Sequence, residues 1–215
     1  VTSSRRWERR GTWRTILLMW RLRLAYFLGA DPHQLARQYN ESSAMRFPDA
    51  SLMIFAKAPV AGAAKTRLAP VLGEQGAADL HARLTERTLH TAVSANLAPV
   101  QLWCSPDCSH PLFQAFVRVG GRQIQHGEIL GDRMANAFET ALGHHPCAVL
   151  VGTDCPAMTA DYLTRAFALL NGGADAVLGP AEDGGYTLIG LRHMDKRLFE
   201  GVAWGTDRVL DETRE

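Results

Sequence analysis

From residue 51 onward, short apolar runs alternate with longer stretches whose apolar residues recur at helical spacing. Short apolar runs predict buried strands, and spacings of three and four residues predict helices. The expected strands are residues 51–56, 100–104, 122–126, 147–152, 175–180 and 186–191. The expected helices are residues 73–96, 111–118, 132–142 and 160–171. This alternation predicts an α/β fold with three layers, α/β/α, around a mostly parallel sheet.

The expected strand at 186–191 should differ in direction from the others. It follows a tight Asp-Gly-Gly turn at residues 183–185. That turn is too short to hold the helical crossover that joins two parallel strands. We therefore expect this strand to run antiparallel or to lie at an edge of the sheet.

Residues 1–44 form a basic N-terminal extension of different composition. They are rich in Arg and Trp and contain no strand or turn punctuation. Three interpretations stay open: an amphipathic basic surface helix, a partner-binding tail, or upstream sequence included by a misplaced start. Met45 and the residues after it resemble a natural beginning. The predicted boundary therefore separates the extension from one domain at residues 45–215.

Charge and cysteine content exclude several classes of protein. Residues 51–215 carry fourteen basic against eighteen acidic side chains, which argues against binding to nucleic acid. Four cysteines are too few for a secreted disulfide framework and lack zinc-site spacing, so a cytoplasmic location is expected. Arg21 and Arg23 interrupt the apolar stretch 16–30, so no membrane span is expected.

In open α/β sheets, ligands bind beyond the carboxyl ends of the strands. The loop after the first strand contains two of the three lysines of the chain, together with small residues that allow a close backbone approach. This composition predicts contacts with phosphate, and the alternative is a solvated basic loop. The P-loop and Gly-x-Gly-x-x-Gly patterns are both absent, which argues against an ATPase or an NAD dehydrogenase. The candidate phosphate-binding residues here are Lys57, Gly62, Lys65, Thr66 and Arg67.

A second candidate is Asp154, which follows the apolar strand 147–152 through a turn of small residues. A carboxylate in this place is suited to bind a divalent cation that bridges phosphates. The alternative role for Asp154 is to cap the next helix, although Thr159 is better placed for that. Cys155, beside it, is interpreted as a small packing residue rather than a nucleophile.

Two further segments contain candidate binding residues. Before the last strand, two carboxylates, two glycine N–H groups and a tyrosine hydroxyl fall together and predict an acceptor site, with a simple hairpin turn as the alternative. These residues are Glu182, Asp183, Gly184, Gly185 and Tyr186. Gly131, Asp132 and Arg133 open a helix whose N-terminus could meet an anion, unless Asp132 only caps it. The eight histidines show no metal-ligand spacing and are interpreted as surface or packing residues.

Five motifs occur in order along the chain: FAKAPVAGAAKTRL, GDRMANAF, VGTDCPAMT, GPAEDGGYTLIGL and WGT. Over about residues 51–210 they resemble the bacterial glycosyltransferase-like proteins called radical-SAM/selenodomain-associated or arsenosugar-biosynthesis transferases. That family looks like a member of the nucleotide-diphospho-sugar transferases, which have the GT-A fold. It is also similar to phospholactate guanylyltransferases and molybdenum-cofactor nucleotidyltransferases.

The resemblance implies a role for each motif. The loop of residues 57–70 would wrap the nucleotide phosphates, Asp154 would hold Mg²⁺ or Mn²⁺, and residues 183–186 would line the acceptor or sugar side. Relatives continue with an Asp-x-Asp-Thr-x-x-Asp-Leu type of segment that supplies a further metal carboxylate. Neither Asp207 nor Asp211 matches that segment. A domain that is short at its C-terminus, with an incomplete metal site, is therefore expected.

Together, these observations predict a metal-dependent transferase that takes a sugar from a nucleotide-diphosphate sugar to a small-molecule acceptor. The cation and the basic loop would neutralise the departing diphosphate. Asp154 is expected to hold the metal, and Asp183 to act as a second ligand or to orient the acceptor. Two alternatives stay open: nucleotidyl transfer from an NTP to a phosphorylated acceptor with release of pyrophosphate, and a non-catalytic nucleotide-binding protein.

Overall fold

The computed structural model describes residues 44–116 and 120–215 of the chain. The predictions for the N-terminal extension therefore fall outside the described residues, except at Ala44, and the boundary near Met45 stays a prediction. None of the helices in the described ranges is long and apolar enough to cross a membrane.

A six-stranded sheet organises the described part of the chain, with the strand order β3-β2-β1-β4-β6-β5. β1 pairs in parallel with β2 and with β4, and β2 pairs in parallel with β3. The six expected strands are all present, with ends shifted by at most two residues. The strands are β1 (Ser51–Lys57), β2 (Val100–Ser105), β3 (Gly121–Ile124), β4 (Ala148–Gly152), β5 (Ala176–Pro180) and β6 (Tyr186–Leu191).

β6 runs antiparallel to both of its neighbours, β4 and β5. The prediction of an antiparallel strand is therefore confirmed. β6 is nevertheless an inner strand, and β5 forms this edge of the sheet. The last four residues of β6 are buried in succession, as expected for a strand that is covered on both faces.

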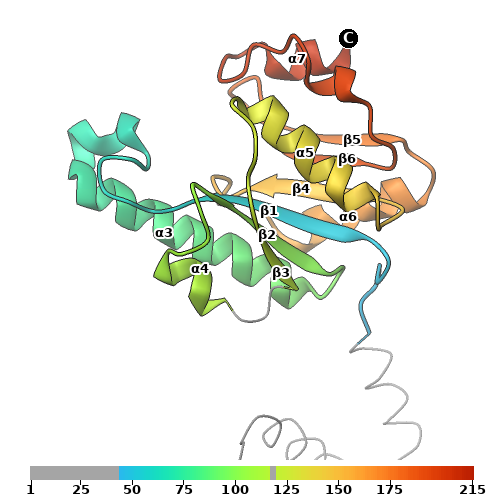
Figure 1. Ribbon diagram of the computed structural model, residues 1–215, viewed down its shortest axis with the longest axis horizontal. Helices are drawn as coiled ribbons and strands as arrows, with labels where there is room; N and C mark the ends of the chain where they lie inside the picture. The colour runs from blue at the N-terminus through green and yellow to red at the C-terminus, as the bar shows by residue number, and fades with distance from the viewer. Residues whose placement is uncertain (1–43, 117–119) are drawn as a thin grey trace, which may run out of the picture. The chain divides into compact units, whose positions relative to one another are not determined.

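Helices cover both faces of the sheet, as Figure 1 shows. Alternate residues of β1 point to opposite faces: Leu52 and Ile54 belong to one buried cluster, and Met53 and Phe55 to the other. The first cluster contains residues of α3, α4 and α6, and the second contains residues of α5. The three-layer α/β/α prediction is confirmed. The helices are α3 (Ala69–Ala95), α4 (Pro111–Ala115), α5 (Leu130–Leu142) and α6 (Ala160–Asn171).

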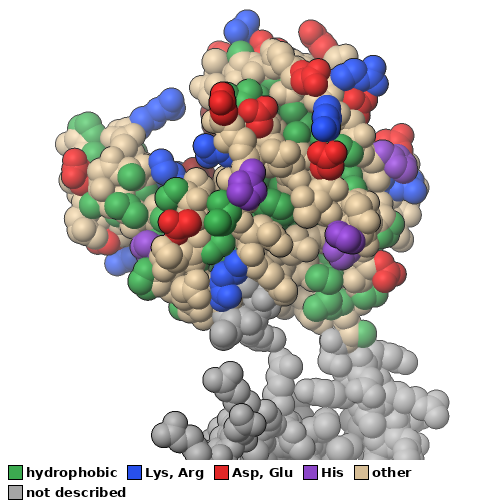
Figure 2. Space-filling model, in the orientation of Figure 1, with side chains coloured by type: hydrophobic (Ala, Val, Ile, Leu, Met, Phe, Trp, Pro, Cys, Tyr) green, Lys and Arg blue, Asp and Glu red, His purple; other side chains and the backbone are tan. Residues whose placement is uncertain are grey.

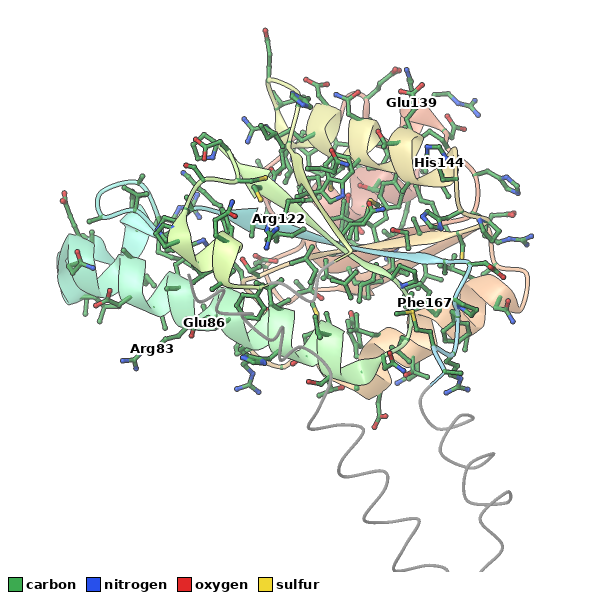
Figure 3. All side chains as sticks on the ribbon, turned by 60° about the horizontal axis from the view of Figure 1, so that its bottom comes forward. Arg83, Glu86, Arg122, Glu139, His144 and Phe167 are labelled. Atoms are coloured by element: carbon green, nitrogen blue, oxygen red, sulfur yellow. The ribbon has the colours of Figure 1, made fainter. Side chains whose placement is uncertain are left out.

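The two sides of α3 differ in their exposure to solvent. Figure 3 shows Arg83 and Glu86 projecting from α3 away from the sheet, and both side chains are exposed. Ala77, His81 and Thr85 are buried. Because these three residues follow one another at intervals of four, they share one face of the helix, and that face packs toward the sheet.

Three short helical elements and the start of α3 differ from the expectation. η1 (Thr66–Leu68) lies within the basic loop, and η2 (Lys196–Phe199) and α7 (Val209–Arg214) follow β6. These elements are too short to show a helical period in the sequence. α3 begins at Ala69, but Gly73 interrupts it with a φ of +72°. The uninterrupted helix therefore starts directly after Gly73, next to the predicted start.

Candidate active site

The parallel pairing of β1 with β4 brings two predicted site segments together. Both strands end at the same edge of the sheet, so the loop after Lys57 lies beside the loop after Gly152. The Nζ atom of Lys65, from the first loop, is 3.0 Å from Oδ2 of Asp154, from the second. The structure therefore brings the predicted phosphate-binding lysine and the predicted metal-binding carboxylate into direct contact.

Lys65 adopts an uncommon backbone conformation at this point. Its φ of +50° and ψ of +40° lie in the left-handed region, which non-glycine residues rarely occupy. Such conformations persist where the surrounding structure imposes them, and they are common at functional sites. The preceding residue, Ala64, is buried, and the Lys65 side chain is only 22% exposed. The loop thus directs the ammonium group of Lys65 toward Asp154.

His81 contacts both of these segments, which the sequence interpretation did not predict. Its Nε2 atom is 3.0 Å from the carbonyl oxygen of Lys57, and its Nδ1 atom is 3.6 Å from Oδ1 of Asp154. The residue is 5% exposed, in agreement with its interpretation as a packing residue. The sequence signal that could have identified His81 is its spacing. It lies four residues after Ala77 and four before Thr85, on the buried face of α3.

These neighbours stabilise the ionised form of Asp154. The His81 side chain and then the Lys65 ammonium group hold the pKa of the Asp154 carboxyl below its usual range. The carboxylate is 64% exposed and is therefore open to solvent and ligands. The alternative role as a helix cap is excluded, because the Thr159 hydroxyl accepts a hydrogen bond from the Tyr162 N–H and caps α6.

The other residues of the basic loop have different surroundings. Lys57 donates a hydrogen bond from Nζ to the carbonyl oxygen of Ala63 at 2.8 Å, so it closes the loop on itself. Gly62, inside this loop, has a φ of +74°. Thr66 and Arg67 are exposed, and the side chain of Arg67 forms no hydrogen bond or ion pair within the described residues. Contacts of these residues with phosphate stay predictions.

The lobe that contains the basic loop stands apart from the body of the described part. Figure 2 shows a hollow between this lobe and the rest of the surface, and Lys or Arg side chains border the hollow. The carboxyl ends of β1 and β4 lead toward the same region. This arrangement offers positive charge beside the strand ends, as a phosphate-binding site requires.

A cavity of about 380 Å³ lies next to this site. Its apolar walls include Phe55, Met134 and Trp204. Arg67 lines it as well, so the basic loop reaches the cavity. Three predicted acceptor-site residues also line it, namely Asp183, Gly185 and Tyr186. Asp154 and Lys65 are not among the lining residues, so the predicted metal and acceptor residues occupy neighbouring but separate places.

The turn between β5 and β6 is fixed by the segment that follows β6. Gly184 has a φ of +80°, and a side chain there would collide with the backbone carbonyl of Asp207. The Leu210 N–H donates a hydrogen bond to the Gly184 carbonyl oxygen at 2.9 Å. The Asp183 carboxylate accepts a hydrogen bond from the Gly185 N–H at 3.1 Å, while Glu182 is exposed. The segment thus forms the hairpin turn named as an alternative, and it also borders the cavity.

Tyr186 forms part of an aromatic group beside the cavity. Its ring meets Trp204 edge to face, with 6.4 Å between the ring centroids, and Trp204 stacks on Phe199. Burial raises the pKa of the Tyr186 hydroxyl to about 12. The hydroxyl is buried and has no hydrogen-bond partner among the described residues, so its proton is available to a group that reaches it.

The residues at the start of α5 have structural partners. Gly131 is buried against Trp204. Asp132 accepts a hydrogen bond from the Ile129 N–H at 3.3 Å, so it caps the helix, as the alternative proposed. Arg133 donates to the Gly127 carbonyl oxygen at 2.9 Å. Anion binding at this helix N-terminus stays a prediction.

Replacing Gly131 by Ala is expected to destabilise the fold. The added Cβ atom would lie 2.5 Å from Nε1 of Trp204 and 2.8 Å from the carbonyl oxygen of Phe199. Overpacking of this kind costs about 1–3 kcal/mol, which lowers the melting temperature by several degrees. The control is Gly143→Ala, whose nearest atom would be 3.4 Å away. Equal melting temperatures for the two variants would contradict the packing argument.

The described residues contain no group of three or more His, Cys, Asp or Glu side chains that could hold a metal ion. Asp154 and His81 are close to each other, whereas Asp183 lines the separate cavity. An ion that depends on substrate phosphates for its remaining ligands needs only one or two protein ligands. The residues present therefore fit a cation held by Asp154 together with a nucleotide. Asp183 as a second ligand stays a prediction.

Two solved structures illustrate the comparison with known folds. A provisionally assigned nucleotide-diphospho-sugar transferase from Desulfovibrio desulfuricans G20 is 29% identical, with a TM-score of 0.70, over 78% of this chain and 74% of that one. The 4-diphosphocytidyl-2C-methyl-D-erythritol synthase from Anaerococcus prevotii DSM 20548 is 13% identical, with a TM-score of 0.49, over 77% of this chain and 83% of that one. The first comparison confirms the GT-A-like α/β/α fold. The second is too distant to support an argument.

No curated protein matches the chain. Residues 88–206 match a protein family described as "Uncharacterized protein conserved in bacteria (DUF2064)". The matched range includes Asp154, the turn at residues 181–185 and Trp204, although it begins after Lys65 and His81. It spans more than half of the chain. The chain therefore belongs to the DUF2064 family.

Proposed function

We propose that this protein is a transferase that takes a sugar from a nucleotide-diphosphate sugar to a small-molecule acceptor. The observation that carries the proposal is the contact between Lys65 and Asp154 at the carboxyl ends of β1 and β4. A similarity of 29% identity to a provisionally assigned nucleotide-diphospho-sugar transferase supports the same class. The neighbouring cavity is a separate binding site, which the acceptor would occupy.

The basic loop would bind the diphosphate of the donor. Lys65 is held by its backbone close to the strand ends, and its ammonium group can turn from Asp154 to a phosphate oxygen. Arg67 lines the cavity and has no other partner in the described residues, so it can contact the same diphosphate from the acceptor side. Lys57 keeps the loop closed through Ala63 and acts on the phosphates only indirectly.

The predicted cation, Mg²⁺ or Mn²⁺, would be held by Asp154. When bound, it would neutralise the negative charge that grows on the departing diphosphate. Asp154 suits this role because its carboxylate is ionised at neutral pH and open to solvent. Lys65 provides positive charge at the same place and would share the diphosphate with the cation.

The acceptor would occupy the cavity beside Asp183 and Tyr186. In the transfer, a new bond forms between the acceptor oxygen and the anomeric carbon, and the bond from that carbon to the diphosphate breaks. The nucleoside diphosphate leaves with the electron pair, and the acceptor hydroxyl releases its proton to solvent water. Asp183 is exposed at the rim and would orient that hydroxyl, while Tyr186 would donate a hydrogen bond.

Two finer predictions accompany this proposal. The motifs resemble those of the radical-SAM/selenodomain-associated or arsenosugar-biosynthesis type of transferases, to which we propose that the chain belongs, and the cysteine content suggests a cytoplasmic protein. Both rest on the sequence.

The proposal is tested by binding and then by product analysis. A panel of NTPs, nucleoside diphosphates and UDP-, GDP-, ADP- and dTDP-sugars, each with and without Mn²⁺, is screened by thermal shift. A metal-dependent shift with one nucleotide sugar, followed by release of the nucleoside diphosphate with an acceptor, is the expected result. Release of pyrophosphate from an NTP would instead establish nucleotidyl transfer. Binding without turnover under all conditions would favour a non-catalytic nucleotide-binding protein.

A further inference from the structure

We propose that His81 is a direct ligand of the divalent cation, through Nδ1, together with Asp154. The site then has a mixed nitrogen and oxygen character and prefers transition-metal ions such as Co²⁺ over Mg²⁺. This inference rests on the proposed function, since it concerns the cation of the same site.

The hydrogen bond of the His81 ring fixes which nitrogen is available. Nε2 lies 3.0 Å from the carbonyl oxygen of Lys57. A carbonyl oxygen can only accept, so Nε2 carries the proton and donates it. In the neutral ring, Nδ1 then has a free electron pair. Metal-binding histidines are oriented in this way, with the second ring nitrogen donating to a backbone carbonyl or a carboxylate.

Nδ1 of His81 lacks a hydrogen-bond partner among the described residues, although it is buried. It faces Oδ1 of Asp154 at 3.6 Å, which is too long for a hydrogen bond. In a neutral ring this free electron pair faces the carboxylate, an unfavourable arrangement that a cation between the two atoms relieves, as a proton on Nδ1 would. Two ligands that each lie about 2.1 Å from one ion are at most about 4.2 Å apart, so the observed separation is compatible with a shared cation.

The surroundings of His81 and Asp154 leave the position between Nδ1 and Oδ1 open to a cation. Lys65 contacts the other carboxylate oxygen, Oδ2, so Oδ1 and Nδ1 stay available. His81 is 5% exposed and anchored to the end of β1, so its ring is already oriented. Asp154 is 64% exposed, which gives an ion access from solvent. The phosphate oxygens of the nucleotide would complete the coordination.

A nitrogen ligand changes the expected order of metal affinities. Mg²⁺ prefers oxygen ligands, whereas imidazole favours Co²⁺, Ni²⁺ and Zn²⁺. A site made of Asp154 and His81 should therefore bind Co²⁺ more tightly than Mn²⁺, and Mn²⁺ more tightly than Mg²⁺. A site made of carboxylate oxygens alone would show a smaller difference between these ions.

The experiment is calorimetric titration of the full chain with Co²⁺, Mn²⁺ and Mg²⁺, each with inorganic pyrophosphate as the phosphate probe. It compares the wild-type protein with His81→Gln, which retains a donor for the Lys57 carbonyl but lacks the Nδ1 ligand. The control is His90→Gln, because His90 is an exposed histidine of the same helix. We expect His81→Gln to lose about 10- to 100-fold in Co²⁺ affinity and less for Mg²⁺, with His90→Gln unchanged.

An equal ratio of Co²⁺ affinity to Mg²⁺ affinity in wild type and His81→Gln would overturn the inference, and a protonated His81 paired with Asp154 would then explain the geometry. Absence of Co²⁺ binding in wild type would overturn it as well. Melting temperatures in EDTA show whether His81→Gln is folded. If it is not, Asp154→Asn removes the other ligand at an exposed position and must abolish the same Co²⁺ site. Failure of the proposed function would be recognised separately, as metal binding without any response to nucleotide sugars.

Discussion

Asp154→Asn is expected to abolish the metal-dependent sugar transfer that we propose for this protein. Asn has nearly the same size but no negative charge, so it removes the proposed cation ligand and the ion-pair partner of Lys65. Loss of one electrostatic contact to a developing charge costs about 100- to 1,000-fold in kcat. The measurement is the initial rate of nucleoside diphosphate release at saturating donor, over a series of Mn²⁺ concentrations.

The control for this variant is Asp161→Asn, an exposed carboxylate in the first turn of α6. It changes the net charge by the same amount without touching the site. A rate for Asp154→Asn close to that of Asp161→Asn, with both proteins folded, would remove Asp154 from the mechanism.

Lys65→Met should weaken the binding of a nucleoside diphosphate about 10- to 100-fold. Met keeps the length and the apolar part of the side chain but lacks the ammonium group. A hydrogen bond to a charged group contributes about 1.5–3 kcal/mol, which corresponds to that change in affinity. The affinity for the free nucleoside should stay the same, because it has no phosphate. Calorimetric titration with the diphosphate and with the nucleoside separates the two effects.

Lys196→Met is the matched control, because Lys196 is an exposed lysine that pairs with Glu139 on another part of the surface. It removes one positive charge from the protein at a distance from the site. Equal losses for nucleoside and nucleoside diphosphate in Lys65→Met would show that the loop does not recognise phosphate.

Most of the fold could be predicted from the pattern of apolar residues. The inner strands β1 and β4 are continuous apolar runs, and α5 and α6 have clear helical spacing, so their positions were evident. The place of β6 in the sheet could not be predicted. A short turn determines that β5 and β6 are antiparallel, but it does not determine which of them pairs with β4. That choice depends on burial in the assembled sheet.

The candidate site could be predicted only for residues in a loop that directly follows a strand. Asp154 and Lys65 stand in loops directly after two strands, so the parallel sheet makes their proximity a consequence of the fold. His81 lies on a helix, and its helical position indicates burial without indicating a neighbour across the sheet edge. A buried histidine that only packs would show the same pattern. Trp204 posed a similar problem, because its contact with Gly131 joins segments far apart in the chain.

The position of β6 also affects the risk of aggregation during folding. Before the hairpin of β5 and β6 docks, one side of β4 has no partner. β4 has the sequence AVLVG, and its first four residues are buried in the native state. An unpaired apolar strand edge is a template on which another chain can add. Docking of a locally formed hairpin therefore protects the most apolar edge of the incomplete sheet from pairing between molecules.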